Sequence, residues 1–178
     1  MNQIVTQIIG YIALFFVVLS FQKNKRVTIL SFMLTGLVIF VVHYSLLRAW
    51  TGALANLIEA GMVFVAYKKE TELWAQHKFW LYIFITLFII GGLVTSRTSV
   101  SSLPILAQIF GTIAVWQKNP RVIRFIMLIP RPLWFVYNLI VGSYAGMTAE
   151  IFIFISVITG IVRFDILNKT SNKLARGG

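Results

Sequence analysis

The stretch QIIGYIA, residues 7–13, decides how this sequence is interpreted, because the chain repeats it as QIFGTIA at residues 108–114. A basic turn follows each copy, QKNKR at residues 22–26 and QKNPR at residues 117–121. A chain of 178 residues that repeats itself once, near half its length, is expected to contain two similar halves.

The composition indicates that most of the chain lies in lipid. Hydrophobic residues make up 58% of it and charged residues only 12%, and the mean hydropathy is +0.85. Soluble domains carry about 25% charged residues. The chain has no Cys, which excludes disulfides, thiolate metal sites and thiol nucleophiles. The net charge of +11 suggests nucleic acid, but its placement in loops explains it better, so no nucleic-acid partner is expected.

Seven apolar segments have about the length of a membrane-spanning helix, which is ~17–25 residues. They cover residues 4–20, 28–47, 51–67, 79–95, 101–116, 122–141 and 145–164. The sequence therefore predicts an all-α membrane protein with seven transmembrane helices.

The basic residues predict the orientation, because basic loops stay in the cytoplasm. One set of loops and the polar tail carry Lys23, Lys25, Arg26, Lys68, Lys69, Lys78, Lys118, Arg121, Arg124, Lys169, Lys173 and Arg176. The opposite set carries only Arg48 and Arg97. The N-terminus is therefore expected outside and the C-terminus in the cytoplasm, which requires an odd number of spans.

The repeat extends well beyond the opening words. A shift of 94 residues aligns the second and third segments with the sixth and seventh, whereas the first and fifth align at a shift of 101. The pairs at 94 are Phe40 with Trp134, His43 with Tyr137, Tyr44 with Asn138, Trp50 with Tyr144, Gly52 with Gly146, Ala55 with Ala149, and Asn56 with Glu150. Three spans, a linker span and three spans make a parallel repeat, whose binding site lies at the interface of the halves near the midplane.

The domain boundaries follow from this pattern. Residues 1–67 form the first three-helix repeat and residues 68–100 the linker helix with its loops. Residues 101–164 form the second repeat, and residues 165–178 a cytoplasmic tail.

Four stretches carry a family resemblance: GTIAVW (111–116), LWFVYNLIVGSYAGMTAEIF (133–152), GIVRFD (160–165) and HYSLLRAWTGALANLIEA (43–60). They resemble the YgjV family of bacterial inner-membrane proteins. The 3+1+3 layout is similar to that of the SWEET sugar transporters and the PnuC vitamin transporters. The resemblance implies a SWEET-like fold and a location in the inner membrane of a bacterial cell. The chain has FQ (21–22) and WQ (116–117) where the wider PQ-loop group has PQ, so a proline hinge is not carried over.

Three charged residues fall inside predicted spans: Glu59, Arg131 and Glu150. Charged groups in the bilayer are costly, and their default interpretation is functional. They are expected either to lie along a polar path that binds a substrate or a proton, or to form a structural ion pair such as Glu59 with Arg131.

Five residues are candidates for binding a solute. Asn56 and Glu150 are equivalent in the repeat, and the resemblance to SWEET transporters implies paired Asn residues facing the substrate on these spans. Trp134, Tyr137 and Asn138 fall together on the sixth span and would suit a ring-containing ligand. The alternatives are an inter-helix hydrogen bond for Asn56 and Glu150, and a position at the membrane interface for the aromatic residues.

Other polar residues receive structural interpretations. His43, near a helix end, is expected at the membrane interface, and Gln7 and Gln108 are expected to bond across the close helix contacts that Gly10 and Gly111 allow. Pro130 and Pro132 should bend the sixth span, because each removes a backbone donor.

No catalytic set is apparent, so the chain is not expected to be an enzyme, and no cofactor or metal is expected. The favoured function is transport of a small polar, ring-containing solute such as a sugar or vitamin by alternating access. The alternative is a non-transporting receptor or assembly factor that reuses the fold. The expected partners are the lipid bilayer and the solute, and homo-oligomerisation stays open.

Overall fold

The computed structural model describes residues 3–21, 23, 25–69, 71–95, 98–117 and 119–167. The main helices are α1 (Gln3–Phe21), α2 (Arg26–Leu46), α3 (Trp50–Lys68), α4 (Phe79–Thr95), α5 (Ser102–Val115), α6 (Pro120–Met127), α7 (Pro130–Val141) and α8 (Tyr144–Gly160). Short helices are η1 (Leu73–Gln76), η2 (Ser99–Ser101) and the π-helix η3 (Ile161–Leu167). These residues contain no strand, so the predicted all-α class is confirmed.

The predicted apolar segments are helical. Five helices are long and apolar enough to cross a membrane, at Gln3–Ser20, Val27–Leu46, Trp50–Lys68, Arg121–Val141 and Tyr144–Ile166. Two shorter apolar helices cover Phe79–Thr95 and Ser99–Ala114. Large apolar side chains face outward along them, and Leu93 and Val94 are each 76% exposed. Such an apolar exterior is what a lipid environment requires.

The sixth predicted segment is interrupted. α6 ends at Met127, and Pro130 begins α7, where its missing N–H is harmless because first-turn donors lack intrahelical partners. Asn119 caps α6 by accepting a hydrogen bond from the Arg121 N–H at 3.0 Å. The backbone of Leu128 and Ile129 keeps right-handed helical dihedral angles, so α7 follows α6 directly, and the bend expected from the prolines stays a prediction.

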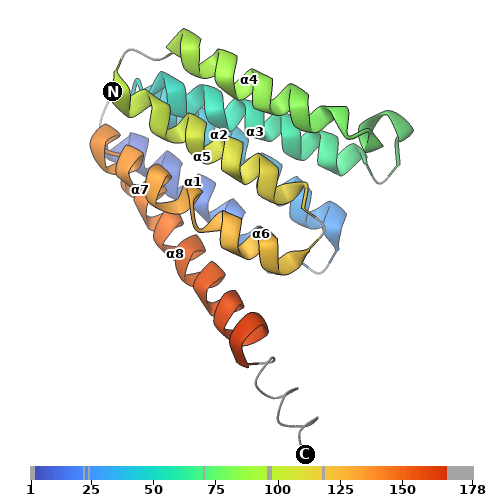
Figure 1. Ribbon diagram of the computed structural model, residues 1–178. Coiled ribbons are helices and arrows are strands. Elements are labelled where there is room, and N and C mark those ends of the chain that lie inside the picture. The colour runs from blue at the N-terminus through green and yellow to red at the C-terminus, as the bar shows by residue number, and fades with distance from the viewer. Residues whose placement is uncertain are drawn as a thin grey trace, which may run out of the picture.

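The helices pack as two similar rows. α2 lies between α1 and α3, and α7 lies between α5 and α8. The rows meet at two places, where α3 packs on α5 and α1 packs on α8, and α4 covers α3 and α5 from outside (Figure 1). In the repeat, α1 corresponds to α5 and α3 corresponds to α8. The contact of α3 with α5 therefore corresponds to the contact of α8 with α1, as expected for halves related by a two-fold rotation.

The turns that end α2 and α7 have the same backbone conformation. Arg48 (φ 57°) and Gly142 (φ 71°) are the positive-φ residues in the described part of the chain, and they are 94 positions apart. The next residue donates its N–H back in each turn, Ala49 to the Tyr44 carbonyl and Ser143 to the Asn138 carbonyl, both at 2.9 Å. The repeat seen in the sequence is thus also present in the backbone.

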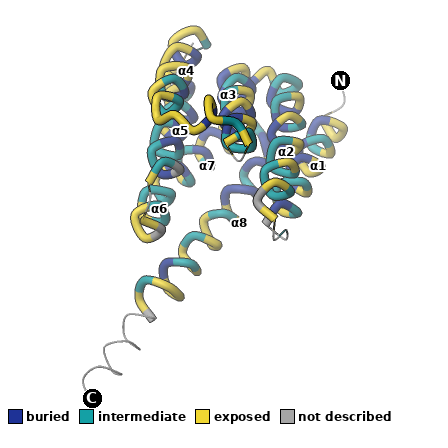
Figure 2. Tube along the Cα trace, turned by 90° about the vertical axis from the view of Figure 1, so that its right-hand side faces the viewer, coloured by how far each residue is buried: buried dark blue, intermediate teal, exposed yellow. Residues whose placement is uncertain are grey.

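The far end of α8 leaves the other helices (Figure 2). One contact there comes from α6, where Arg124 Nε and Nη2 donate to the two carboxylate oxygens of Asp165, each at 2.8 Å. The Arg124 guanidinium also lies over the Phe164 ring, 5.6 Å from its centroid. This bidentate pair joins α6 to η3, the segment that follows α8.

Several residues used in the topology prediction lie outside the described residues. They are Arg97, Lys118 and the tail residues Lys169, Lys173 and Arg176, and the side chain of Arg26 is likewise not described.

Candidate functional site

His43 is fully buried and connects three elements. Its Nδ1 lies 2.8 Å from the Thr6 carbonyl of α1, and its Nε2 lies 2.8 Å from the Ser143 hydroxyl at the start of α8. The Ser143 hydroxyl also accepts from the Gly146 N–H at 3.1 Å, which leaves its own hydrogen for His43. These partners assign the neutral ring with hydrogen on Nδ1. His43 thus lies between helices near the end of α2, whereas its predicted position at the membrane interface stays a prediction.

Tyr137 is the repeat counterpart of His43. It connects α7 of the second half to α3 of the first half, as His43 connects α2 of the first half to the start of α8 in the second. Its hydroxyl accepts from the Gly52 N–H at 2.8 Å and lies 3.4 Å from the Ala49 carbonyl, which it reaches as donor. Ala49 and Gly52 begin α3, just as Ser143 and Gly146 begin α8. Each half therefore sends one ring from its middle helix to the start of the third helix of the other half.

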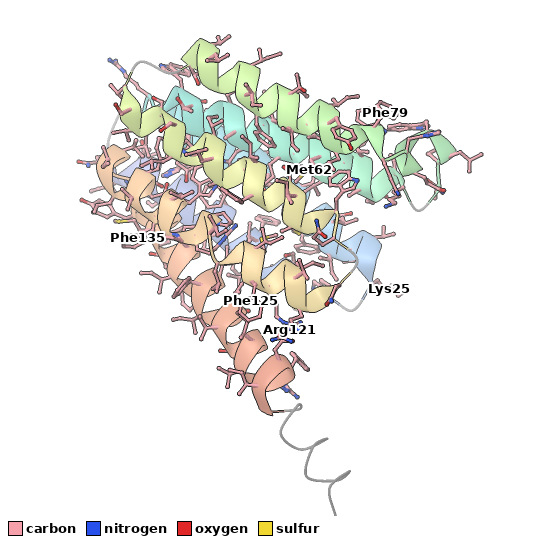
Figure 3. All side chains as sticks on the ribbon, viewed as in Figure 1. Lys25, Met62, Phe79, Arg121, Phe125 and Phe135 are labelled. Atoms are coloured by element: carbon pink, nitrogen blue, oxygen red, sulfur yellow. The ribbon has the colours of Figure 1, made fainter. Side chains whose placement is uncertain are left out.

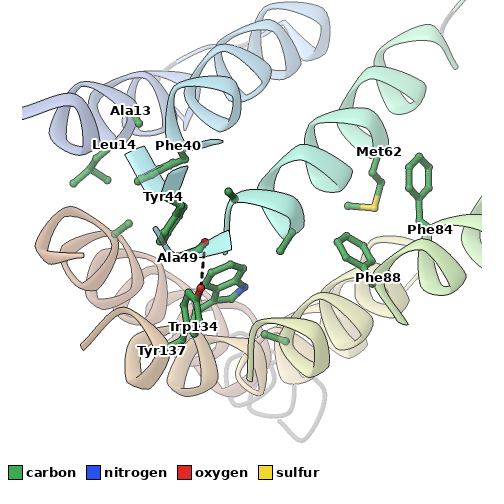
Figure 4. Close-up of a cluster of buried hydrophobic side chains, with 14 of the residues drawn as sticks. Ala13, Leu14, Phe40, Tyr44, Ala49, Met62, Phe84, Phe88, Trp134 and Tyr137 are labelled. Atoms are coloured by element: carbon green, nitrogen blue, oxygen red, sulfur yellow. Dashed lines mark hydrogen bonds between the residues drawn. The ribbon is translucent and has the colours of Figure 1, made fainter. Parts of the chain in front are cut away.

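Tyr44 and Asn138 meet at the centre of this arrangement. The Tyr44 hydroxyl donates to Asn138 Oδ1 at 2.6 Å. The rings of Tyr44, Trp134 and Tyr137 lie within 6.3 Å of one another, measured between centroids. Figure 4 shows them together, with the bond from Tyr137 to Ala49 dashed. The predicted residues Trp134, Tyr137 and Asn138 are thus brought together.

Asn138 carries an unused donor. Its side chain is 1% exposed, and its Nδ2 has no hydrogen-bond partner in the described part of the chain. A buried amide without a partner is costly and commonly marks a place for water or ligand.

The intramembrane charges pair differently from the predicted alternative of Glu59 with Arg131. Arg131 Nη1 donates to Glu150 Oε2 at 3.0 Å, whereas Gln108 Nε2 donates to Glu59 Oε2 at 2.6 Å. The reason is the packing order, since α7 lies directly beside α8 and α5 lies beside α3. Arg131 Nε is buried without a partner among the described residues.

Asn56 and Glu150 are not joined by a hydrogen bond that the structure records. Asn56 is buried, and its Nδ2 donates to the Gly52 carbonyl of its own helix at 2.9 Å. Glu150 instead faces Arg131. The two repeat-equivalent positions therefore have different partners, although both lie one and a half turns or so into their helices.

A pocket of about 240 Å³ lies between α7 and α8, and both residues of the ion pair contribute to its lining. Its lining residues are Arg131, Pro132, Phe135, Glu150, Ile151, Phe154 and Ile155. Phe135, labelled in Figure 3, lies on α7 near α8. Asn56 and Asn138 are not among the lining residues, so this pocket unites only part of the predicted site.

A family model described as a bacterial inner membrane protein family, Imp-YgjV, matches residues 4–167. The chain belongs to this family. No curated protein and no solved structure matches it. Membership in Imp-YgjV agrees with the predicted resemblance and with the apolar exterior of the helices, and it places the chain in a bacterial inner membrane.

Sequence reasoning missed the hydrogen-bond partners of three polar residues in this member of Imp-YgjV. Gln7 does not bond across Gly10; its Nε2 donates to the Gly142 carbonyl at 2.7 Å, and its Oε1 accepts from the Tyr144 N–H at 3.2 Å. Ser143 and Gln108 likewise have partners on distant helices. The shift of 94 could have indicated Ser143, because it is the counterpart of Ala49 at the start of a third helix.

In the described part of the chain, no group of three or more His, Cys, Asp or Glu side chains could hold a metal ion. The chemistry that the site offers is therefore hydrogen bonding, charge pairing and aromatic contact.

Proposed function

We propose that this Imp-YgjV protein is a transporter with seven spans in the SWEET-like 3+1+3 arrangement, with its N-terminus outside and its C-terminus in the cytoplasm. It moves a small polar, ring-containing solute such as a sugar or vitamin by alternating access, and it acts as a carrier rather than an enzyme.

The observation that carries the proposal is the pocket between α7 and α8 to whose lining Arg131 and Glu150 both contribute. Its accessible surface is apolar, from Phe135, Ile151 and Phe154, and the paired charges lie behind it. Pockets for small ligands combine mostly apolar walls with a few convergent polar groups. An ion pair held in the middle of a membrane protein is costly, and such groups commonly mark solute or ion pathways.

The aromatic and amide groups beside the ion pair support a ring-containing solute. Trp134 and Tyr137 are buried and pack edge to face on each other, so a solute would reach their rings only when the halves move apart, and Asn138 offers an unused N–H donor. Arg131 Nε offers a second unused donor on the same helix. A solute with ring carbons and oxygen acceptors would satisfy these groups, with Asn56 on the facing half available if it releases Gly52.

Alternating access would act on the contacts between the halves. His43 with Ser143, Tyr44 with Asn138, and Tyr137 with Gly52 all join one half to the other near the predicted outer ends of the helices. These bonds close the outer end, and a rocking motion of one half against the other would have to break them before a solute could enter from outside.

A ligand thermal-shift screen on the purified protein tests this proposal. The panel comprises sugars, nucleosides, vitamins and amines at high millimolar concentration, because ligand at ten times its Kd stabilises by only about 1.4 kcal/mol. We expect at least one compound to raise Tm in wild type and in Glu72→Gln, but not in Glu150→Gln. Glu72 is the matched control because it precedes η1, far along the chain from the pocket. The same shift in Glu150→Gln would contradict the proposed site.

A second candidate function is a non-transporting receptor or assembly factor. The close pairing of the central polar residues favours it, because a sealed set of hydrogen bonds suits a scaffold better than a passage. Absence of any Tm shift across the panel would favour this alternative over transport.

A further inference from the structure

Away from the ends of the apolar spans, the chain carries more negative than positive side chains. Glu59 and Glu150 are the two carboxyls in these middle parts, and Arg131 is the cation, whereas Lys68, Arg121, Arg124, Arg163 and Asp165 lie near span ends. Arg131 lies against Glu150, with its Nη1 3.0 Å from Glu150 Oε2, and its Nε has no partner among the described residues. One guanidinium cannot balance two carboxylates, so one positive charge is missing from the core.

The contacts show which carboxyl lacks a cation. Arg131 donates through Nη1 to Glu150, while the recorded hydrogen-bond partner of Glu59 is the neutral amide of Gln108. The helices packed on α3 add no compensating charge, because α4 contains no charged residue and α2 after Arg26 contains only His43, which bonds to Thr6 and Ser143. An uncompensated carboxylate in such a place is strongly disfavoured.

We propose that Glu59 binds a proton, which supplies the missing positive charge and makes it the proton-binding site of the core. A metal cation fits less well, because the Gln108 N–H hydrogen points at Glu59 Oε2 and would repel it. A neutral carboxyl suits this contact, since Oε2 accepts from Gln108 while Oε1 carries the proton. The proposal goes beyond the proposed function by naming the ion that such a carrier could couple to its solute.

Infrared spectroscopy of the full-length protein in lipid nanodiscs at neutral pH, with no solute added, tests the proton directly. A protonated carboxyl has a C=O stretch that is distinct from carboxylate bands and shifts in heavy water. We expect this band in wild type and its loss in Glu59→Gln. The measurement requires no transport, so its outcome is independent of whether the chain is a carrier.

A substitution of the neighbouring amide assigns the band, because removal of either acid also changes the charge balance. Gln108→Leu removes the hydrogen bond to Glu59 and leaves both carboxyls and Arg131 in place. We expect it to shift the frequency of the band. Gln7→Leu is the matched control, since Gln7 is the repeat counterpart of Gln108 and bonds to the turn before α8 instead. This control should leave the frequency unchanged.

Two results would overturn the proposal. Absence of a protonated-carboxyl band in wild type at neutral pH would mean that neither acid holds a proton. A band that Gln108→Leu leaves unmoved would place the proton on Glu150. Circular dichroism of each variant confirms that a missing band does not come from unfolding.

Discussion

The Tyr44 hydroxyl donates a hydrogen bond of 2.6 Å to Asn138 Oδ1, and the two residues are 94 positions apart, which is the shift that relates the second and third helices to the sixth and seventh spans. Each residue therefore bonds to its own counterpart. Two equivalent positions can touch only near the axis that relates the halves. Tyr44 and Asn138 thus lie close to the axis between the two halves.

Loss of the Tyr44 hydroxyl should destabilise the contact between the halves. In Tyr44→Phe, Asn138 Oδ1 is left buried without its donor, which costs about 1–3 kcal/mol. The free energy of unfolding in mixed micelles should fall by this amount. Tyr82→Phe is the control, because Tyr82 is 69% exposed, and it should change stability by less than about 0.5 kcal/mol. Equal effects from the two variants would contradict a central role for Tyr44.

Gly52 and Gly146, which lie near the starts of α3 and α8, should not tolerate a methyl group. A Cβ on Gly52 would lie 2.9 Å from the Tyr137 ring, and one on Gly146 would lie 2.6 Å from the Asn138 carboxamide. Gly52→Ala and Gly146→Ala should each lower stability by about 1–3 kcal/mol. Gly61, whose added Cβ would meet only Phe84 at 3.8 Å, is the control. Gly61→Ala should be neutral or raise stability by up to about 1 kcal/mol, and a loss there like that at Gly52 would refute the argument.

The helix positions and the repeat could be predicted from the sequence because both depend on local pattern. Apolar length predicted the helical segments, and the shift of 94 predicted that His43 and Tyr137, or Gly52 and Gly146, occupy equivalent places. The pairing of charges could not be predicted, because it depends on which helices are neighbours. Arg131 bonds to Glu150 rather than to Glu59 because α7 packs on α8. The amino-acid composition does not indicate which helices are neighbours.

The turns that end α2 and α7 give a test of the repeat that involves no side-chain contact. A Cβ on Gly142 would meet nothing within 4 Å, so Gly142→Ala measures only the cost of a positive φ. It should lower stability by about 1 kcal/mol. Arg48→Gly should leave stability unchanged or raise it by up to about 1 kcal/mol. Glycine adopts the positive φ without steric strain, but it also raises the conformational entropy of the unfolded chain, which offsets part of the gain. Chemical denaturation of both variants checks this, and a loss on Arg48→Gly would show that the Arg48 side chain matters more than its backbone.

The orientation can be tested with single cysteines, because the chain contains none of its own. Arg48 and Lys69 are both exposed, at opposite ends of α3. A membrane-impermeant maleimide added to intact spheroplasts should label Arg48→Cys but not Lys69→Cys, and lysis should make both react. Labelling of Lys69→Cys in intact spheroplasts would reverse the proposed topology.

Solute uptake into proteoliposomes tests the central claim most directly, with the compound that gives the largest thermal shift. Wild type and Glu72→Gln should both take up the labelled solute faster than empty liposomes. Glu150→Gln should reduce the rate at least about tenfold, which corresponds to about 1.4 kcal/mol of lost solute stabilisation at the Arg131–Glu150 pair. Uptake by wild type no faster than by empty liposomes, for a compound that binds, would contradict transport and leave a receptor that holds its ligand without moving it.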